Sequence, residues 1–148
     1  MTILDKYGNT ALFYASGLQY PNDLDAENEL FPKPDEDIVS MMINKGADIN
    51  QPNSVYWTPL MYACQNNNYE IIEKFLSSEV IKVNHQDREG VTPLMLSCSV
   101  GDLKTIKLLI EHKADISIKD NSGKNALSYA LTNNNSEVVS YLRKATIY

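Results

Sequence analysis

The residues that build metal sites, disulfides and catalytic centres are scarce in this chain of 148 residues. Its two histidines, His85 and His112, have no second histidine, cysteine or carboxylate at the spacing that metal ligands need. The chain contains no glycine-rich phosphate loop, no nucleophile elbow and no pair of acids on one helical face. We therefore expect a protein without catalytic residues, metal or cofactor, and so not an enzyme.

Long apolar runs are also missing. No stretch approaches the roughly 20 apolar residues that a membrane-spanning helix requires. The N-terminus, Met1–Lys6, lacks the charged region followed by an apolar one that a secretion signal would have. These absences predict a protein of the cytoplasm or the nucleus that does not insert into membranes.

Basic residues are outnumbered by acidic ones, 13 to 19, which gives a formal net charge of −6 at pH 7. This balance disfavours nucleic acid and anionic membranes as partners and favours a basic protein surface. Mild acidity also keeps many ordinary domains soluble, so the net charge leaves both interpretations open.

The most regular part of the chain, residues 87–119, predicts two short helices. Thr92 is a good N-cap, and Pro93 suits the first helical position because its missing N–H would have no helical partner there. Gly101 ends the first helix, since it tolerates positive φ. The second helix carries apolar residues three and four positions apart: Leu103, Ile106, Leu108, Leu109 and Ile110. Two helices this short cannot bury their apolar faces alone, so they need similar neighbours.

Similar segments occur on both sides. The Thr-Pro-Leu-Met that begins at Thr92 occurs again at Thr58, and the segments at Thr10 and Asn125 open in a related way. Residues 46–50, Gly-Ala-Asp-Ile-Asn, end a second helix as residues 114–117 do. A period near 33 residues, with Thr-Pro-Leu openings and this ending, resembles the ankyrin repeat. The resemblance covers nearly the whole chain.

The resemblance implies an all-α solenoid in which helix-turn-helix units stack side by side and β-hairpin fingers project from them. A single domain then spans residues 1–148. Its repeats are expected at about residues 5–52, 53–86, 87–119 and 120–148.

Cys64 and Cys98 occupy equivalent places in the first helices of adjacent repeats, and we expect them in a buried column with Ser16 and Leu131. Packed helices lie about 10 Å apart, whereas a disulfide spans at most ~7 Å between Cα atoms. We therefore expect two buried thiols and no disulfide. The asparagine runs 66–68 and 133–135 fall where first helices end, and a left-handed helix end is a structural role that suits asparagine.

The first repeat carries an insertion at residues 18–36, where the other repeats use about four residues. One interpretation is an acidic contact loop with Tyr20 and Phe31 at its edges. The other is a tolerated surface insertion whose Tyr20, Leu24 and Phe31 fold back over the end of the stack. Long loops in compact domains are usually functional or disordered, which leaves both interpretations open.

Two departures from the family pattern predict local differences. Tyr56 stands where a finger normally has glycine, and tyrosine resists positive φ, so this finger should bend differently from those at Gly90 and Gly123. Other residues replace the histidine that the family usually has in its first helices, and the hydrogen bonds of that histidine should be missing. The replacements are Phe13, Met61, Met95 and Ser128.

The expected function follows from the resemblance. In ankyrin arrays the finger tips and one face of the first helices form a concave groove that binds other proteins. We therefore predict a non-catalytic protein-interaction module. Its partner-binding residues are expected to be Tyr7, Asn9, Val55, Trp57, Gln65, Arg88, Glu89, Val91 and Lys124. Trp57, the only tryptophan, is either an exposed hot spot or packs against neighbouring fingers.

Two alternatives come from other classes of protein. The first is a targeting domain of a larger enzyme or secreted effector whose catalytic part lies outside this chain. The second is a scaffold that self-associates through the uncapped ends of the stack. An open reading frame that continues beyond the chain would favour the first, and light scattering over a concentration series tests the second.

Overall fold

The computed structural model describes residues 6, 8–17 and 35–145 of the chain. These residues form eight α-helices and no β-strand. The helices come in four pairs: α1 (Ala11–Ala15) with α2 (Glu36–Asn44), α3 (Pro59–Gln65) with α4 (Tyr69–Leu76), α5 (Pro93–Val100) with α6 (Leu103–Glu111), and α7 (Ala126–Thr132) with α8 (Ser136–Ala145).

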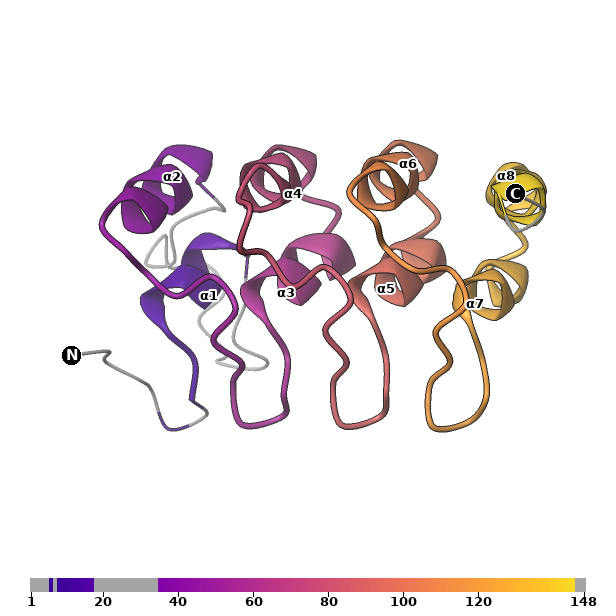
Figure 1. Ribbon diagram of the computed structural model, residues 1–148, viewed down its shortest axis with the longest axis horizontal. Helices are drawn as coiled ribbons and strands as arrows, with labels where there is room; N and C mark the ends of the chain where they lie inside the picture. The colour runs from indigo at the N-terminus through magenta and orange to yellow at the C-terminus, as the bar shows by residue number, and fades with distance from the viewer. Residues whose placement is uncertain (1–5, 7, 18–34, 146–148) are drawn as a thin grey trace, which may run out of the picture.

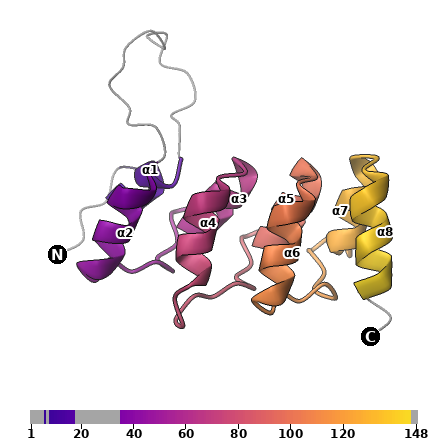
Figure 2. The ribbon, with the colours of Figure 1, turned by 90° about the horizontal axis from the view of Figure 1, so that it is seen from above.

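The four pairs stand side by side in one row (Figure 1). The first helices, α1, α3, α5 and α7, form one layer, and the second helices form another, in which α2, α4, α6 and α8 follow one another along the row (Figure 2). Between pairs the chain runs down to a turn that projects beyond the first-helix layer (Figure 1). We call residues 50–58, 84–92 and 117–125 the second, third and fourth fingers. The predicted all-α repeat fold is confirmed, with fingers closed by turns and not by strands.

The first helices begin at N-caps that the sequence predicts. Thr58 Oγ1 accepts a hydrogen bond from the backbone N–H of Met61 at 3.4 Å. In return the Met61 sulfur accepts one from the backbone N–H of Thr58 at 3.5 Å. The same exchange occurs at the start of α5, and Ser128 Oγ accepts from the Asn125 N–H in α7. The prediction that hydrogen bonds would be missing at these positions is therefore wrong for three helices, because a thioether or a hydroxyl is also an acceptor.

The helix α2 begins earlier than the predicted insertion allows. Asp35 is its N-cap and accepts hydrogen bonds from the backbone N–H groups of Asp37 and Ile38 at 2.9 and 3.1 Å. The last two residues of the insertion, Asp35 and Glu36, thus belong to the start of α2. The rest of it, with the aromatic residues that the two interpretations invoke (Tyr20 and Phe31), lies outside the described residues.

The structural role predicted for the asparagine runs is confirmed. Asn67 and Asn134 take positive φ angles of 53° and 54°, as Gly101 does at 89°. Neighbouring asparagines also connect the repeats. Asn135 Nδ2 donates to the Gly101 carbonyl at 2.7 Å, and Asn68 Nδ2 donates to the Ser16 carbonyl of the preceding repeat at 3.2 Å. The amides therefore join the ends of successive first helices.

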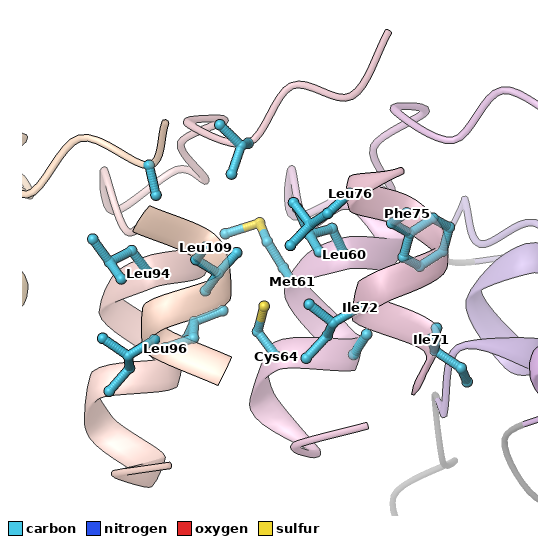
Figure 3. Packing of buried hydrophobic residues seen from close by; sticks show 14 of the residues in the cluster. Leu60, Met61, Cys64, Ile71, Ile72, Phe75, Leu76, Leu94, Leu96 and Leu109 are labelled. Atoms are coloured by element: carbon cyan, nitrogen blue, oxygen red, sulfur yellow. The ribbon is translucent and has the colours of Figure 1, made fainter. Parts of the chain in front are cut away.

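The core lies between the two helix layers and between neighbouring pairs (Figure 3). Phe75 of α4 and Leu109 of α6 are completely buried. Leu60, Leu94 and Leu127 occupy the same position in the first helices α3, α5 and α7. Leu60 and Leu94 are buried, and Leu127 packs against the same cluster while partly exposed. One continuous apolar cluster therefore runs along the row, and its burial is the main favourable term in folding.

The cysteines agree with the prediction, but the column they belong to is shorter than expected. Cys64 and Cys98 are buried and form no disulfide. Ser16 is buried as well, whereas Leu131 is 48% exposed. The prediction for Leu131 is wrong because α7 belongs to the last described pair, and this position faces the side on which a further repeat would pack.

Both thiols should be unreactive in the folded protein. Burial raises the pKa of Cys64 and of Cys98 from 9.0 to about 12, and the thiolate is the reactive form. A chromogenic disulfide reagent at pH 8 should therefore label neither cysteine until denaturant is added. Because the unfolded thiols ionise near pH 9 and the folded ones do not, this contribution to stability is lost as the pH rises from about 9 to 12. Rapid labelling of the native protein would contradict the assigned burial.

Candidate protein-binding surface

An acidic side chain shapes the turn of the third finger. The Asp87 carboxylate accepts hydrogen bonds from the backbone N–H groups of Glu89 and Val91 at 3.0 and 2.8 Å. The Gly90 N–H donates to the Asp87 carbonyl at 3.0 Å and closes the turn. Asp120 organises the fourth finger in the same way. The tips are therefore held by their own hydrogen bonds and present defined positions to solvent.

The second finger has the same turn although its residues differ. Asn53 Oδ1 accepts from the backbone N–H groups of Val55 and Trp57 at 3.1 and 3.0 Å. Tyr56 takes the glycine position with a φ of 66°, and its N–H donates to the Asn53 carbonyl at 3.0 Å. The prediction of a differently bent finger is wrong, because the turn hydrogen bonds hold Tyr56 in a left-handed conformation that costs an ordinary residue about 1–2 kcal/mol.

Trp57 connects two fingers and the first-helix layer. Its indole Nε1–H donates to Asp87 Oδ2 at 2.9 Å, and its ring centre lies 4.8 Å from that of Tyr62 in α3. The Tyr62 ring in turn contacts Phe13 edge-on, with 5.5 Å between centres. Of the two interpretations of Trp57, packing against a neighbouring finger is the one observed.

Replacement of Trp57 by phenylalanine should lower the free energy of unfolding by about 1–2 kcal/mol, because Asp87 is buried and loses a donor. Chemical denaturation followed by circular dichroism measures this loss. Tyr129→Phe is the matched control, since the Tyr129 hydroxyl donates to Asp120 at 2.8 Å where water has better access. Its loss should be smaller, and equal losses would contradict the role of burial.

Charge differs between the two halves of the row. Residues 35–79 contain seven acidic and two basic side chains, whereas residues 80–145 contain seven acidic and nine basic ones. At the finger tips, Arg88 lies over the ring of Tyr56, with 5.4 Å from its guanidinium carbon to the ring centre. The acidic excess of the chain is therefore not located at the third and fourth fingers.

The part of the chain that the structure describes contains neither a cluster of metal ligands nor a membrane-spanning helix. No three His, Cys, Asp or Glu side chains there are grouped so as to hold a metal ion. No helix there is long and apolar enough to cross a bilayer. His85 and His112 each lie 2.9 Å from a backbone carbonyl oxygen.

A family model for ankyrin repeats, built of three copies, matches residues 29–120 and again residues 74–147. The chain belongs to the ankyrin-repeat family. It is 30% identical over 124 residues to alpha-latrotoxin-Lg1a of Latrodectus geometricus, a match that covers 82% of this chain and 9% of the toxin.

Two further relatives carry the family in their names. Ankyrin repeat and SAM domain-containing protein 6 of Mus musculus is 33% identical over 84 residues, which cover 56% of this chain and 10% of the mouse protein. A putative ankyrin repeat protein of fowlpox virus (strain NVSL) is 32% identical over 108 residues, covering 73% and 25%. The chain thus spans about a tenth to a quarter of the length of these relatives. The ankyrin-repeat family is generally non-catalytic, and membership of it supports a generic protein-interaction module for this chain.

The predicted partner-binding residues lie in different environments of this ankyrin domain. The exposed ones are Val55, Gln65, Arg88, Glu89 and Lys124. Trp57 and Val91 are partly buried, and Asn9 is 5% exposed and accepts a hydrogen bond from Asn53 Nδ2. Tyr7 lies outside the described residues. Val55 and Arg88 are thus the exposed members of the predicted set on the adjacent second and third finger tips, together with Glu89.

Three tyrosines were missing from the predicted set. Tyr56 is 52% exposed at the tip of the second finger. Tyr62 and Tyr129 are partly buried in the first helices α3 and α7. In the sequence, Tyr62 and Tyr129 could have been noticed because each lies four residues after the N-cap of its helix, Thr58 or Asn125.

Tyr129 and Asp120 perturb each other at the base of the fourth finger. Burial, and then the hydrogen bond to Asp120, raise the pKa of Tyr129 to about 12. The backbone N–H of Lys124, more than the Tyr129 hydroxyl, holds the pKa of the Asp120 carboxyl below its usual value. Both groups therefore keep their charge state at neutral pH, and the surface has no titrating centre here.

Proposed function

We propose that this ankyrin domain binds a partner protein through the tips of its second and third fingers. The observation that supports this most is the exposure of Val55 and Tyr56, 46% and 52%, on one tip beside Arg88. Exposed aromatic side chains and arginine are enriched among the residues that dominate binding energy at interfaces. The turn hydrogen bonds hold the backbone that carries these side chains, so less backbone conformational entropy is lost on binding.

The test is quantitative affinity capture with matched variants. A Val55→Ser, Arg88→Ala variant should capture the partner at least tenfold less well, a loss of about 1.4 kcal/mol or more. Trp57→Ala is a poorer choice, because it also breaks the bond to Asp87. Arg143→Ala, an exposed cation of α8 in the other layer, is the control. A finger variant that captures the same proteins equally well would show that the site lies elsewhere.

A basic partner, suggested by the net charge, would fit the second helices α2 and α4 better than the fingers, because the acidic excess lies in residues 35–79 and none of these carboxylates is in the second finger. A triple reversal of Glu36, Glu70 and Glu73 to lysine tests this separately. All three are exposed on second helices. Unchanged capture would exclude a basic partner on this layer.

Self-association through the end of the row is a second candidate. It is supported by the exposure of Leu131, whose equivalents Cys64 and Cys98 are fully buried in α3 and α5, the first helices against which a following first helix packs. The molar mass from light scattering should then rise with protein concentration, and Leu131→Ser should prevent the rise. A mass that stays at one chain would exclude it. No described residue specifically favours the remaining alternative, a targeting domain of a larger enzyme or effector.

A further inference from the structure

We infer that the segment bound by the second and third fingers is acidic, with a carboxylate paired to Arg88 and an apolar side chain packed on Val55 and Tyr56. The inference rests on the proposed function, because it names the chemistry of what these tips bind. It depends on three observations: a strained aromatic residue, an arginine that forms no ion pair with a described residue, and the carboxylates of Asp87 and Asp120, which are already engaged in the turns.

The fold does not require the side chain of Tyr56. The turn is closed by backbone hydrogen bonds and by Asn53 Oδ1, none of which involves the phenol ring. The equivalent positions in the other two fingers are Gly90 and Gly123, which adopt the same positive φ. A bulky residue with positive φ is costly, and such strain concentrates at binding sites. The ring, half in solvent, is therefore available to a partner.

Arg88 is oriented, and among the described residues it is paired with no carboxylate. The Tyr56 ring supports its guanidinium group at 5.4 Å, and Asn121 fixes the backbone beneath it by donating from Nδ2 to the Arg88 carbonyl at 2.9 Å. Arg88 forms no ion pair with any residue that the structure describes. Stacking on an aromatic face leaves the edge of a guanidinium open, and that edge pairs with a carboxylate through two parallel hydrogen bonds.

The nearby carboxylates are engaged in the turns. Asp87 accepts from two backbone N–H groups and from Trp57, and Asp120 accepts from two backbone N–H groups and from Tyr129. In the third finger Glu89 is an exposed anion next to the exposed cation Arg88, and Lys124 is an exposed cation of the neighbouring fourth finger. An acidic segment can therefore pair with Arg88 and approach Lys124, although the whole chain is acidic.

The probe is a library of random 12-residue peptides displayed on phage and selected against the whole chain. Enriched peptides should contain aspartate or glutamate next to an apolar residue. Synthetic copies should bind about tenfold more weakly, by fluorescence anisotropy, to the Arg88→Gln and Tyr56→Gly variants. Glycine at position 56 adopts the positive φ without strain, so the Tyr56→Gly variant should melt at the same temperature as the natural chain or higher. Such a result would show that weaker binding by this variant is not caused by misfolding. Arg143→Gln is the control and should bind normally.

A charge reversal makes the test specific. Arg88→Glu should abolish binding of a selected peptide, and a lysine in place of the peptide carboxylate should restore it. Basic or uncharged consensus peptides, or no peptide with a Kd below about 1 mM, would overturn the inference. Binding that depends on Val55 but not on Arg88 or Tyr56 would overturn it and leave the finger site standing. Binding that no finger variant changes would count against the proposed function as well.

Discussion

Replacing Leu109 with alanine is expected to lower the free energy of unfolding by about 3–4 kcal/mol, within the span of about 2–5 kcal/mol for buried leucines. Leu109 is 0% exposed in α6 and faces the continuous core (Figure 3). Truncation removes apolar contacts and leaves a cavity that short helices of neighbouring pairs can close only in part. Urea denaturation followed at 222 nm measures the loss.

Leu131→Ala is the matched control for this substitution. It removes the same atoms from a first helix at a site that is 48% exposed, so the loss should stay below about 1 kcal/mol. In a repeat array each pair depends on its immediate neighbours, so the Leu109 variant should also unfold over a broader range of urea. Similar losses for the two variants would show that the row is not held together by the core between the pairs.

Alanine at Gly90 should cost about 3 kcal/mol, and alanine at Gly123 only about 1 kcal/mol. Both glycines have nearly the same φ, +81° and +80°, so the conformational cost of a side chain is shared by the two variants. A Cβ at Gly90 would lie 3.0 Å from the Asn121 nitrogen and 3.0 Å from Asp120 Cα, both in the backbone of the fourth finger. A Cβ at Gly123 meets nothing within 4 Å.

The difference between the two glycine variants therefore measures how tightly the third and fourth fingers pack. The Asn121 N–H donates to the Glu89 carbonyl at 2.8 Å, and a displaced finger would lose this bond. Thermal unfolding gives both stabilities, and hydrogen exchange at Asn121 reports on the bond itself. Equal losses would mean that the fingers move apart without cost.

The sequence predicts the repeat and its helices because their signals are local. Thr58 and Thr92 cap helices with donors three residues away, and Pro93 occupies a position that needs no N–H. Asn67 takes the left-handed helix end in place of glycine as expected. Each of these features is decided within one turn of helix, so the residue types alone indicate it.

The predictions that failed or stayed open concern residues whose conformation or burial depends on other parts of the turn or on a neighbouring repeat. Tyr56 resists its φ, but the turn hydrogen bonds around Asn53 outweigh that preference. The partner of Trp57 is Asp87, 30 residues along the chain, so the sequence left its packing open. Leu131 is exposed because burial at its position comes from the following repeat. The repeat positions of Val55 and Arg88 indicate exposed finger residues, whereas the contact between Tyr56 and Arg88 depends on how the two fingers pack and has no local signal.

The unequal distribution of acidic and basic side chains has a consequence for how this domain meets other molecules. With the excess of carboxylates in residues 35–79 and the excess of cations in residues 80–145, the row carries an electric dipole moment along its length. A charged partner would be turned by that field before it makes contact, over about 8 Å at physiological ionic strength. An acidic ligand would then approach the α5–α8 half first, and added salt would slow its arrival more than it would speed its departure.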